Sequence, residues 1–522
     1  MRHSMIIPLL LLSIATATGA MADEIRIGTI TIQTENVFGA GEDDRAAFEI
    51  ANHLHVTTRE SLVRKFLLFG EGDRFDQEKL DQTERNLRAL GFLRSVEITT
   101  SDPHDGLVDV TVITRDAWST QPEVSVGSKG GGNKLSLDLT EENLFGQGRQ
   151  LTVGYRSDPD RDAQYIIYQD PAILGPYITG AASFENASDG ISAALELTHP
   201  FFDTETDRSW DLSYSRVDRT RRIYDLGIVS NEFQRLTEEL RVGGGFALAS
   251  TPRSAHRILA GLDWSKAAFS PAEESLEAAV LPEDRDFRTL FVGYQYLSND
   301  YIKARYVDRG PLDQDFNLGT ELTLRAGISP DWLGLDDTTY LLEGKAAHGW
   351  RINPDTFALG SLSYTTRTGP VNANELLSGS FEMFHLHGTG SHRTTLAGLS
   401  FDLGNDLDLD RRLELDGANG LPGYRLHAYS GDSRAVASLE HRIFSGREFG
   451  RLLTPGVAFF ADAGWIDSAA GSNTIGDVGF GILLFLTRSS RNLIRADVAY
   501  PLVEDPLGRS GIVISVSTGG RF

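Results

Sequence analysis

The chain contains 522 residues, among them 53 glycines and no cysteine, and its formal net charge is -24. Without cysteine there can be no disulfide framework and no thiolate metal site. The acidic balance argues against nucleic acid as a partner, because such binding depends on Lys and Arg side chains that neutralise phosphates. The mean hydropathy of -0.21 gives no sign of membrane helices. A transmembrane β-barrel has ordinary hydropathy too, since its apolar and polar residues alternate.

The segment 1–22 is typical of a secretory signal peptide. Arg2 precedes an apolar run from Ile6 to Ile14, and Ala20-Met21-Ala22 forms a small-residue cleavage site. The run is shorter than the roughly 20 apolar residues that a membrane helix needs. We therefore expect a mature chain that begins near Asp23, and an uncleaved anchor is the alternative.

Residues 23–119 have a mixed pattern, which predicts a small α+β domain. Isoleucines alternate from Ile25 to Ile32, with a break near Gly28 that is typical of a bulge. The other expected elements, in order, are a polar helix at Asp43–Leu54, a helix opened by a capping box at Thr57–Glu60, a helix capped by Asp76 and ended by Gly91, and a hairpin that turns at Asp102–Gly106.

From residue 120 to residue 522, alternation with a period of two replaces the helical pattern. A soluble sandwich alternates too, but it has no need of about 400 residues of this pattern in one run. Closure into a barrel removes the strand edges, as a bilayer requires. We therefore predict a mostly β chain with a C-terminal antiparallel transmembrane β-barrel of about 16 to 20 segments. In the clearest segment the residues of one face are Phe316, Leu318, Leu322, Leu324 and Ala326.

Four short motifs stand out in this region. The stretch Gly420–Phe444 begins as a turn that contains Leu421-Pro422-Gly423-Tyr424 and continues as an alternating strand. Farther along lies Phe460-Ala461-Asp462-Ala463-Gly464. Asn143-Leu144-Phe145-Gly146-Gln147-Gly148 is a turn rather than a phosphate loop, because no helix follows it. The chain ends in an aromatic residue, Phe522.

These motifs resemble the BamA/TamA and two-partner-secretion superfamily of outer-membrane barrels. There the sixth loop carries a (V/L)-R-G-(F/Y) tip, a later strand carries F-x-D-x-G, and an N-x-x-G-x-G turn joins the second and third strands. The assembly machinery reads a terminal aromatic residue, which here is Phe522. Residues 23–119, through Gly70–Phe75, Asn86–Leu93 and the hairpin, resemble one POTRA domain, the periplasmic module of the same superfamily.

The resemblance implies about 16 strands in the outer membrane of a Gram-negative bacterium, inserted there by the barrel assembly machinery, with the POTRA domain in the periplasm. It also implies that an exposed POTRA strand edge binds an unfolded or secreted client protein, and a rigid plug or spacer is the alternative. The implied function is insertion or translocation of clients, and a passive channel or receptor barrel is the alternative. An insertase needs a weak seam, expected here between Glu123–Ser128 and Ile512–Thr518.

The loop tip departs from the family pattern at one position. In relatives the tip arginine reaches the aspartate of F-x-D-x-G, but here that position is Pro422. Arg425 is the nearest cation, so we expect it to pair with Asp462, because a buried carboxylate without a partner is costly. The alternative is a solvated Asp462 and a loop held by Tyr424. The candidate loop-tip residues are Leu421, Pro422, Gly423, Tyr424 and Arg425, and the candidate lumen partners are Phe460, Asp462, Gly464, Glu440 and Arg442.

Enzymatic and metal-dependent functions find little support. No Gly-x-Ser-x-Gly elbow is present, which removes the patatin-like lipases that sometimes share this architecture. We expect no enzyme and no cofactor, and a surface enzyme is the alternative. His385, His387 and His392 could bind a metal, but a solvated rim loop is the preferred interpretation. The acidic runs Asp158–Asp162 and Asp406–Asp410 lack the Gly and Glu of a calcium loop, so acidic loops are preferred there too.

Overall fold

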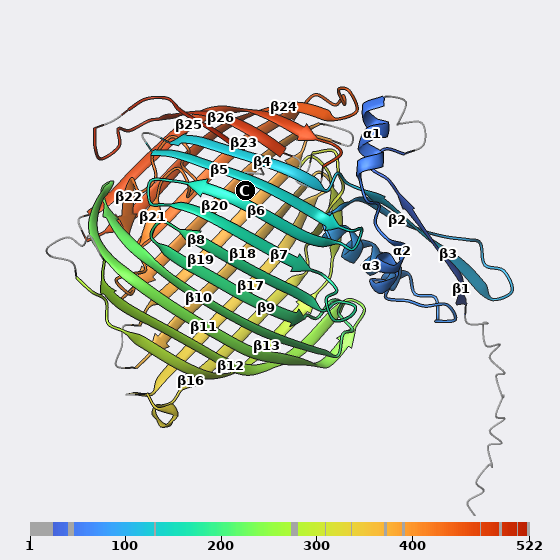
Figure 1. Ribbon diagram of the computed structural model, residues 1–522, viewed down its shortest axis with the longest axis horizontal. Helices are drawn as coiled ribbons and strands as arrows, with labels where there is room; N and C mark the ends of the chain where they lie inside the picture. The colour runs from blue at the N-terminus through green and yellow to red at the C-terminus, as the bar shows by residue number, and fades with distance from the viewer. Residues whose placement is uncertain are drawn as a thin grey trace, which may run out of the picture.

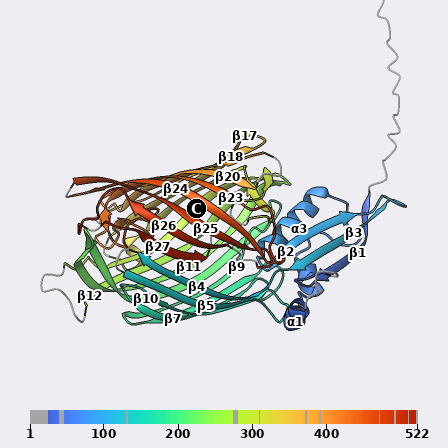
Figure 2. The same ribbon diagram turned by 90° about the horizontal axis from the view of Figure 1, so that it is seen from above.

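In the computed structural model the chain forms a large β-barrel with a small α+β domain at one end (Figure 1, Figure 2). The predicted signal peptide, residues 1–22, and the terminal Phe522 lie outside the described residues. The structure describes residues 25–39, 46–129, 132–272, 280–307, 310–335, 337–369, 373–388, 392–469, 471–489, 493–508 and 510–518.

The N-terminal domain consists of β1 (Arg26–Glu35), α1 (Ala46–Leu54), α2 (Glu60–Lys65), α3 (Gln77–Ala89), β2 (Leu93–Thr100) and β3 (Leu107–Asp116). Its sheet has the order β1-β3-β2. A register shift between Ile27 and Ile30 confirms the bulge predicted near Gly28. Asp76 caps α3 by accepting the N–H of Glu78, as predicted.

The core of this domain lies between the sheet and the helices α2 and α3. Leu80 and Leu87 of α3 and Val63 of α2 belong to one buried cluster with Val110 and Val112 of β3. Full burial of such a side chain contributes about 1.5–3 kcal/mol. Helix α3 is therefore fixed to its own sheet, which leaves its other face available to the barrel.

The barrel is a closed ring of twenty strands among the described residues. The pairs β14–β15 and β21–β22 form small sheets outside the ring. The bounds are β4 (Thr120–Lys129), β5 (Gly132–Leu144), β6 (Arg149–Ser157), β7 (Asp162–Asp170), β8 (Thr179–Ala187), β9 (Gly190–His199), β10 (Arg208–Asp225), β11 (Ile228–Thr251), β12 (Ser254–Pro271), β13 (Arg285–Ser298), β14 (Tyr301–Ala304), β15 (Gln314–Asn317), β16 (Thr320–Ser329), a 3-10 turn (Asp331–Leu333), β17 (Thr339–Asn353), β18 (Thr356–Thr368), β19 (Glu375–Leu386), β20 (Arg393–Asn405), β21 (Leu413–Leu415), β22 (Tyr429–Gly431), β23 (Ser433–Phe444), β24 (Leu453–Ser468), β25 (Gly471–Leu486), β26 (Leu493–Pro501) and β27 (Val513–Thr518).

The strand number of about 16 implied by the resemblance is therefore wrong. Part of the difference comes from residues 162–199, which form the three separate strands β7, β8 and β9. β8 and β9 pair antiparallel from Thr179 opposite Thr198 to Ala187 opposite Gly190, so they are a hairpin and not one longer strand.

The alternation separates an outer from an inner face of the barrel. On β24, Phe459 is 55% exposed and the adjacent Phe460 is 4% exposed. On β23, Leu439 is 54% exposed and the adjacent Glu440 is 0% exposed. The outer face is thus apolar and the inner face carries charged side chains, which is the pattern of a barrel in lipid. No helix among the described residues is long and apolar enough to cross a membrane.

One part of the predicted alternation does not belong to the barrel wall. The sequence places Phe316 and Leu318 on the same face as Leu322, but the strand is interrupted at Gly319, which lies outside both β15 and β16. The ring of Phe316 instead lies 5.0 Å from the ring of Phe357, in a buried cluster that includes Leu318. The connection between β13 and β16 therefore folds into the barrel.

The turn between β5 and β6 joins the barrel to the N-terminal domain. It connects the second and third barrel strands, as the resemblance implies. The side-chain amide of Asn143 donates to Oγ1 of Thr58 at 2.9 Å. The predicted capping box at Thr57–Glu60 is wrong, because the N-cap of α2 is Arg59, which makes no side-chain cap. Thr58 thus serves the contact between domains.

Gly148→Ala should loosen this contact. Gly148 has a φ of 65°, and a Cβ there would lie 2.7 Å from a ring carbon of Phe92. Overpacking of this kind costs about 1–3 kcal/mol, so limited proteolysis of the link between β3 and β4 should become faster. Gly72→Ala is the matched control, since Gly72 has a φ of 87° and no atom within 4 Å of an added Cβ. Equal effects of the two variants would contradict the packing argument.

Candidate functional site

The connection between β20 and β23, residues 406–432, folds back into the lumen, and we refer to it as the long loop. It contains β21 and β22, which lie toward the barrel end opposite the N-terminal domain (Figure 1). Leu421 and Tyr424 of the long loop share a buried cluster with Ile466 of β24 and Ile475 of β25. The loop therefore packs against the inner face of these two strands.

The backbone of the predicted tip is held by a carboxylate. The N–H of Gly423 donates to Oδ2 of Asp477 at 2.8 Å, and Asp477 is 0% exposed on β25. Pro422 has no N–H to donate, so the next residue makes this contact. An added Cβ on Gly423 would lie 2.7 Å from Cβ of Asp477, which leaves no room for a side chain.

The tip side chains fit against glycine on the wall. A Cβ on Gly464 would lie 2.6 Å from Cδ1 of Leu421, so Gly464 provides the space that Leu421 fills. The hydroxyl of Tyr424 lies 3.0 Å from the carbonyl oxygen of Gly476 and 3.1 Å from that of Val503. Tyr424 is thus both packed and hydrogen-bonded, and the predicted tip and Gly464 do meet.

Arg425 pairs with a different carboxylate from the predicted one. Its Nε lies 3.3 Å from Oδ2 of Asp505, in the connection between β26 and β27. Asp462 is 5% exposed on β24 and lies opposite Asp477 of β25. The predicted pair of Arg425 with Asp462 is wrong, because Tyr424 fills the space near the wall and the next side chain turns toward the β26–β27 connection.

Glu440 and Arg442 face the lumen but belong to a second cluster. Nη1 of Arg495 on β26 lies 2.9 Å from Oε1 of Glu440, which also accepts from Nε of Arg442. Nε of Arg495 lies 2.7 Å from Oδ2 of Asp497. The ring of Phe460 lies 5.5 Å from the Arg495 guanidinium carbon. This network contacts the connection between β13 and β16 through Arg442.

The first part of the long loop is bound to another part of the wall. Oδ1 of Asp410 accepts from Nη2 of Arg285 at 2.9 Å, and Oδ2 lies 3.2 Å from Nε of Arg235. Asp408 accepts from Arg367. These arginines belong to β13, β11 and β18, and β11 is nine strands from β24 in the ring. The loop thus spans the lumen, and the acidic run binds arginines where solvated acidic loops were preferred.

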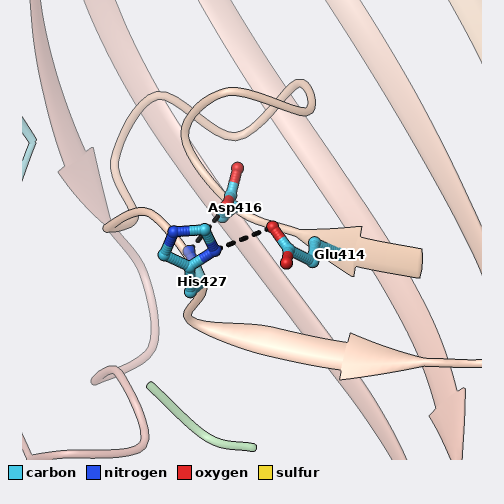
Figure 3. A group of neighbouring side chains, drawn as sticks. All are labelled: Glu414, Asp416 and His427. Atoms are coloured by element: carbon cyan, nitrogen blue, oxygen red, sulfur yellow. Dashed lines mark hydrogen bonds and ion pairs between the residues drawn. The ribbon is translucent and has the colours of Figure 1, made fainter. Parts of the chain in front are cut away.

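A further group lies where the long loop turns back toward β22. Nδ1 of His427 lies 2.9 Å from Oε2 of Glu414, and its main-chain N–H donates to Oδ2 of Asp416 at 2.7 Å (Figure 3). Nε2 of His427 lies 3.3 Å from Oδ2 of Asp160 in the β6–β7 turn. The ring stacks on Tyr224 of β10 with centroids 3.8 Å apart. His427 therefore ties the loop to one more connection of the wall and to strand β10.

The surroundings of His427 favour its charged form. Burial opposes protonation, but the hydrogen bonds and charges of Asp160 and Glu414 outweigh it and raise the pKa of His427 to about 10. Burial also opposes ionisation of Asp160, but His427 and Tyr224 lower its pKa to about 2. The imidazolium of His427 and the carboxylate of Asp160 are thus both charged at neutral pH.

Glu414, Asp416 and His427 are the one group among the described residues whose donor atoms lie close enough for a metal, within 4.8 Å of one another. A histidine ligand must be neutral, whereas both ring nitrogens here face carboxylates. The geometry therefore fits a structural ion pair that holds the long loop in place. The predicted candidates His385 and His387 are instead hydrogen-bonded to the hydroxyls of Thr356 and Thr395.

Beside the long loop the lumen keeps a cavity of about 860 Å³. Strands β9–β13 and β16–β18 line it, together with the first part of the loop. Basic and acidic residues are equally numerous around it, so it favours neither anions nor cations. The charged lining residues are Arg235, Arg241, Arg285, Arg325, Arg367, Arg411, Glu196, Glu239, Asp263, Glu343, Asp408 and Asp410.

Sequence reasoning missed Asp477, Asp505 and His427. One signal for Asp477 exists, since it alternates with Gly476 and Val478 on the strand next to the F-x-D-x-G motif. Pairing that strand in register with Asp462 would have identified it. Asp505 and His427 lie in connections, where period-two alternation carries no information.

His427→Gln should loosen the long loop at neutral pH. A raised folded pKa means that the contribution is complete below the ordinary value of 6.5 and is lost as pH rises through about 10. Charge-assisted hydrogen bonds are worth about 1.5–3 kcal/mol, so subtilisin should cut the loop roughly tenfold faster in the variant at about pH 7. This ratio should fall toward one near pH 10. Tyr424→Phe is the control, and its effect should not follow this pH dependence.

The Arg425 pairing can be tested by a double-mutant cycle on the same cleavage rate. Arg425→Gln and Asp505→Asn should be non-additive by about 0.5–1 kcal/mol, as for a partly exposed pair. Arg425→Gln and Asp462→Asn should add independently. A larger coupling of Arg425 with Asp462 than with Asp505 would contradict the observed contact.

Comparison with known proteins identifies the N-terminal domain. Residues 49–115 match the POTRA family model, described as surface antigen variable number repeat. BamA from Haemophilus ducreyi lacking POTRA domains 1–3 is 11% identical, with 95% of this chain and 85% of that chain covered and a TM-score of 0.37. CdiB from Acinetobacter baumannii is 12% identical (95% and 74% covered, TM-score 0.46), and CdiB from Escherichia coli is 13% identical (95% and 77% covered, TM-score 0.46). No curated protein matches the sequence. Residues 49–115 thus match the POTRA family model, and in this chain they precede a closed β-barrel.

Proposed function

We propose that the protein lies in the outer membrane of a Gram-negative bacterium, with its POTRA module in the periplasm, and inserts or translocates client polypeptides. The apolar outer face supports a membrane location, because it can lie against lipid. The closed ring supports it too, because no strand edge is left with unsatisfied backbone groups. The POTRA match supports the periplasmic side for residues 49–115. Insertion of the barrel itself then falls to the barrel assembly machinery.

The observation that carries this proposal is a weak seam between the first and last strands. Among the described residues, β4 and β27 share three residue pairs, Val126–Val516, Gly127–Ser515 and Ser128–Ile514. Of the two adjoining pairs of strands, β4–β5 has ten residue pairs and β26–β27 has six. A net contribution of about 0.5–1.5 kcal/mol per hydrogen bond makes separation at β4–β27 the least costly opening in this part of the ring.

The POTRA sheet supports a docking site for an extended client. Among the described residues, β2 pairs with β3 and with no other strand. The edge of β1 is occupied, since Gly72 donates to the carbonyl of Ile27 and the N–H of Ile27 donates to the carbonyl of Asp73, both at 2.8 Å. The unpaired groups of β2 could therefore accept an added strand.

A passive channel is the second candidate function. The cavity beside the long loop favours it, because a solute path needs space in the lumen. A channel has no need for a seam that opens, so a lock on the seam separates the two functions.

Gly127→Cys combined with Ser515→Cys should provide this lock. The two positions are Cα partners across the seam, and the natural chain has no cysteine. If clients use the seam, oxidation should reduce assembly of a urea-denatured outer-membrane barrel protein into proteoliposomes by about tenfold or more, the factor of a 1.4 kcal/mol change. Reductant should restore it, and ion conductance should not change.

Ile482→Cys with Ala496→Cys is the matched control, since these residues pair within the extensive β25–β26 ladder. Oxidation of this pair should leave assembly unchanged. Both proteins should migrate faster unheated than boiled on a gel, which verifies a closed barrel. Normal assembly by the oxidised seam variant would rule out passage of clients through the seam and favour the function of a passive channel.

A further inference from the structure

The connection between β13 and β16 enters the lumen from the end that carries the POTRA module. Its described residues are 299–307 and 310–319, and we call them the inner hairpin because β14 and β15 pair within it. Val307 is 0% exposed, Leu318 3% and Ala304 5%. A connection at the rim of a barrel normally lies in solvent, so burial of this degree marks a segment with a fixed place.

The inner hairpin reaches across the mouth of the barrel. Near its base, Leu318 packs in a cluster with Phe384 of β19 and Leu396 of β20. At its far side, an added Cβ on Gly310 would lie 2.6 Å from Cδ2 of Phe485 on β25. β25 is eight strands from β13 by the shorter way round a ring of twenty. The hairpin therefore extends over much of the arc of wall between these two strands and contacts strands that lie between them.

Buried polar groups fix its inner side. Nη1 of Arg442 donates to the carbonyl oxygen of Val307, and Oγ1 of Thr394 donates to that of Tyr306 at 2.7 Å. Arg442 is 0% exposed and is also bound by Glu440. A buried guanidinium is costly unless its donors are satisfied. The charge network on β23 and β26 thus specifies where the hairpin lies.

Helix α3 of the POTRA module holds the outer side. Nε and Nη2 of Arg88 donate to the two carboxylate oxygens of Asp315, each at 2.9 Å. Nζ of Lys303 lies 2.8 Å from Oε1 of Glu84. The guanidinium of Arg85 lies 4.4 Å from the ring centroid of Tyr301. Three residues of one helix face thus contact the hairpin, through charges rather than apolar surface.

We propose that the inner hairpin is a gate at the POTRA-side mouth of the lumen and that α3 holds it closed. The contacts of the hairpin with the barrel wall are buried, whereas its contacts with α3 are polar. A force on the POTRA module therefore acts on the α3 contacts, which are weaker and depend on charge. A client that displaces the module would thereby remove the outer support of the hairpin and leave it held by its inner contacts alone. This gate controls the lumen, and its action does not require the β4–β27 seam to open.

Charge reversal tests the gate in the full-length protein in planar bilayers with KCl. Arg88→Glu and, separately, Asp315→Arg should raise the fraction of time in a conducting state by up to roughly fivefold, the factor that one such pair can supply. The double variant restores opposite charges and should return conductance toward the wild type. Conductance equal to the wild type in both single variants would overturn the proposal.

Arg253→Glu is the matched control. Nη2 of Arg253 lies 3.2 Å from Oε1 of Glu78, so this pair also joins α3 to the barrel but touches the β11–β12 turn instead of the hairpin. Its reversal should leave conductance unchanged. An increase equal to that of Arg88→Glu would assign the effect to loosening of the whole module and overturn the gate. The unheated gel shift verifies that each variant contains a folded barrel.

Labelling gives a second readout that does not depend on conductance. Val307→Cys would be the sole cysteine of the chain and would lie at a fully buried position. N-ethylmaleimide should modify it slowly in an otherwise wild-type protein and several-fold faster when Arg88→Glu is added. Equal labelling rates in the two backgrounds would show that the hairpin stays in place and would refute the role of α3. Failure of the seam lock to affect assembly would leave this result untouched.

Discussion

A closed ring of twenty strands encloses more space than the side chains of its wall can fill. Small barrels of about eight strands are packed by their own interior residues, whereas about 16 strands already enclose an aqueous channel. The chain meets this constraint with two of its connections. The long loop, residues 406–432, enters from one end, and the inner hairpin enters from the end that carries the POTRA module. How much of the lumen stays open therefore depends on how these two segments are held.

Both segments are held largely by buried charges. Asp408 and Asp410 bind arginines of β11, β13 and β18, and Glu440 connects Arg442 with Arg495. Such pairs add little net stability compared with apolar packing, but a carboxylate or guanidinium that loses its partner in a buried place is strongly penalised. The positions of the two segments are therefore strongly specified. Each segment has one arrangement in which its charges are satisfied, and intermediate arrangements are costly.

Residue pattern predicted the parts of this structure that depend on local geometry. The turn at Leu421 to Tyr424 follows from its residue types, whereas the meeting of this tip with Gly464 was implied by the family resemblance of the two motifs. The partner of Arg425 was not predictable, since Asp505 belongs to another connection whose path follows from the whole barrel. The same holds for His427 and Asp160. Alternation through Phe316 and Leu318 misled for a related reason: a period of two does not tell whether a strand stays in the wall or breaks at Gly319.

The last two strands connect the seam with both internal segments. Arg495 of β26 binds Glu440, which binds the Arg442 that holds the inner hairpin. The β26–β27 connection supplies Val503 to Tyr424 and Asp505 to Arg425 at the loop tip. β27 itself forms one side of the seam. A movement of β26 and β27 that opens the seam must therefore strain contacts of the hairpin and of the tip. Coupling of this kind is reciprocal, so release of either segment should in turn lower the cost of opening the seam.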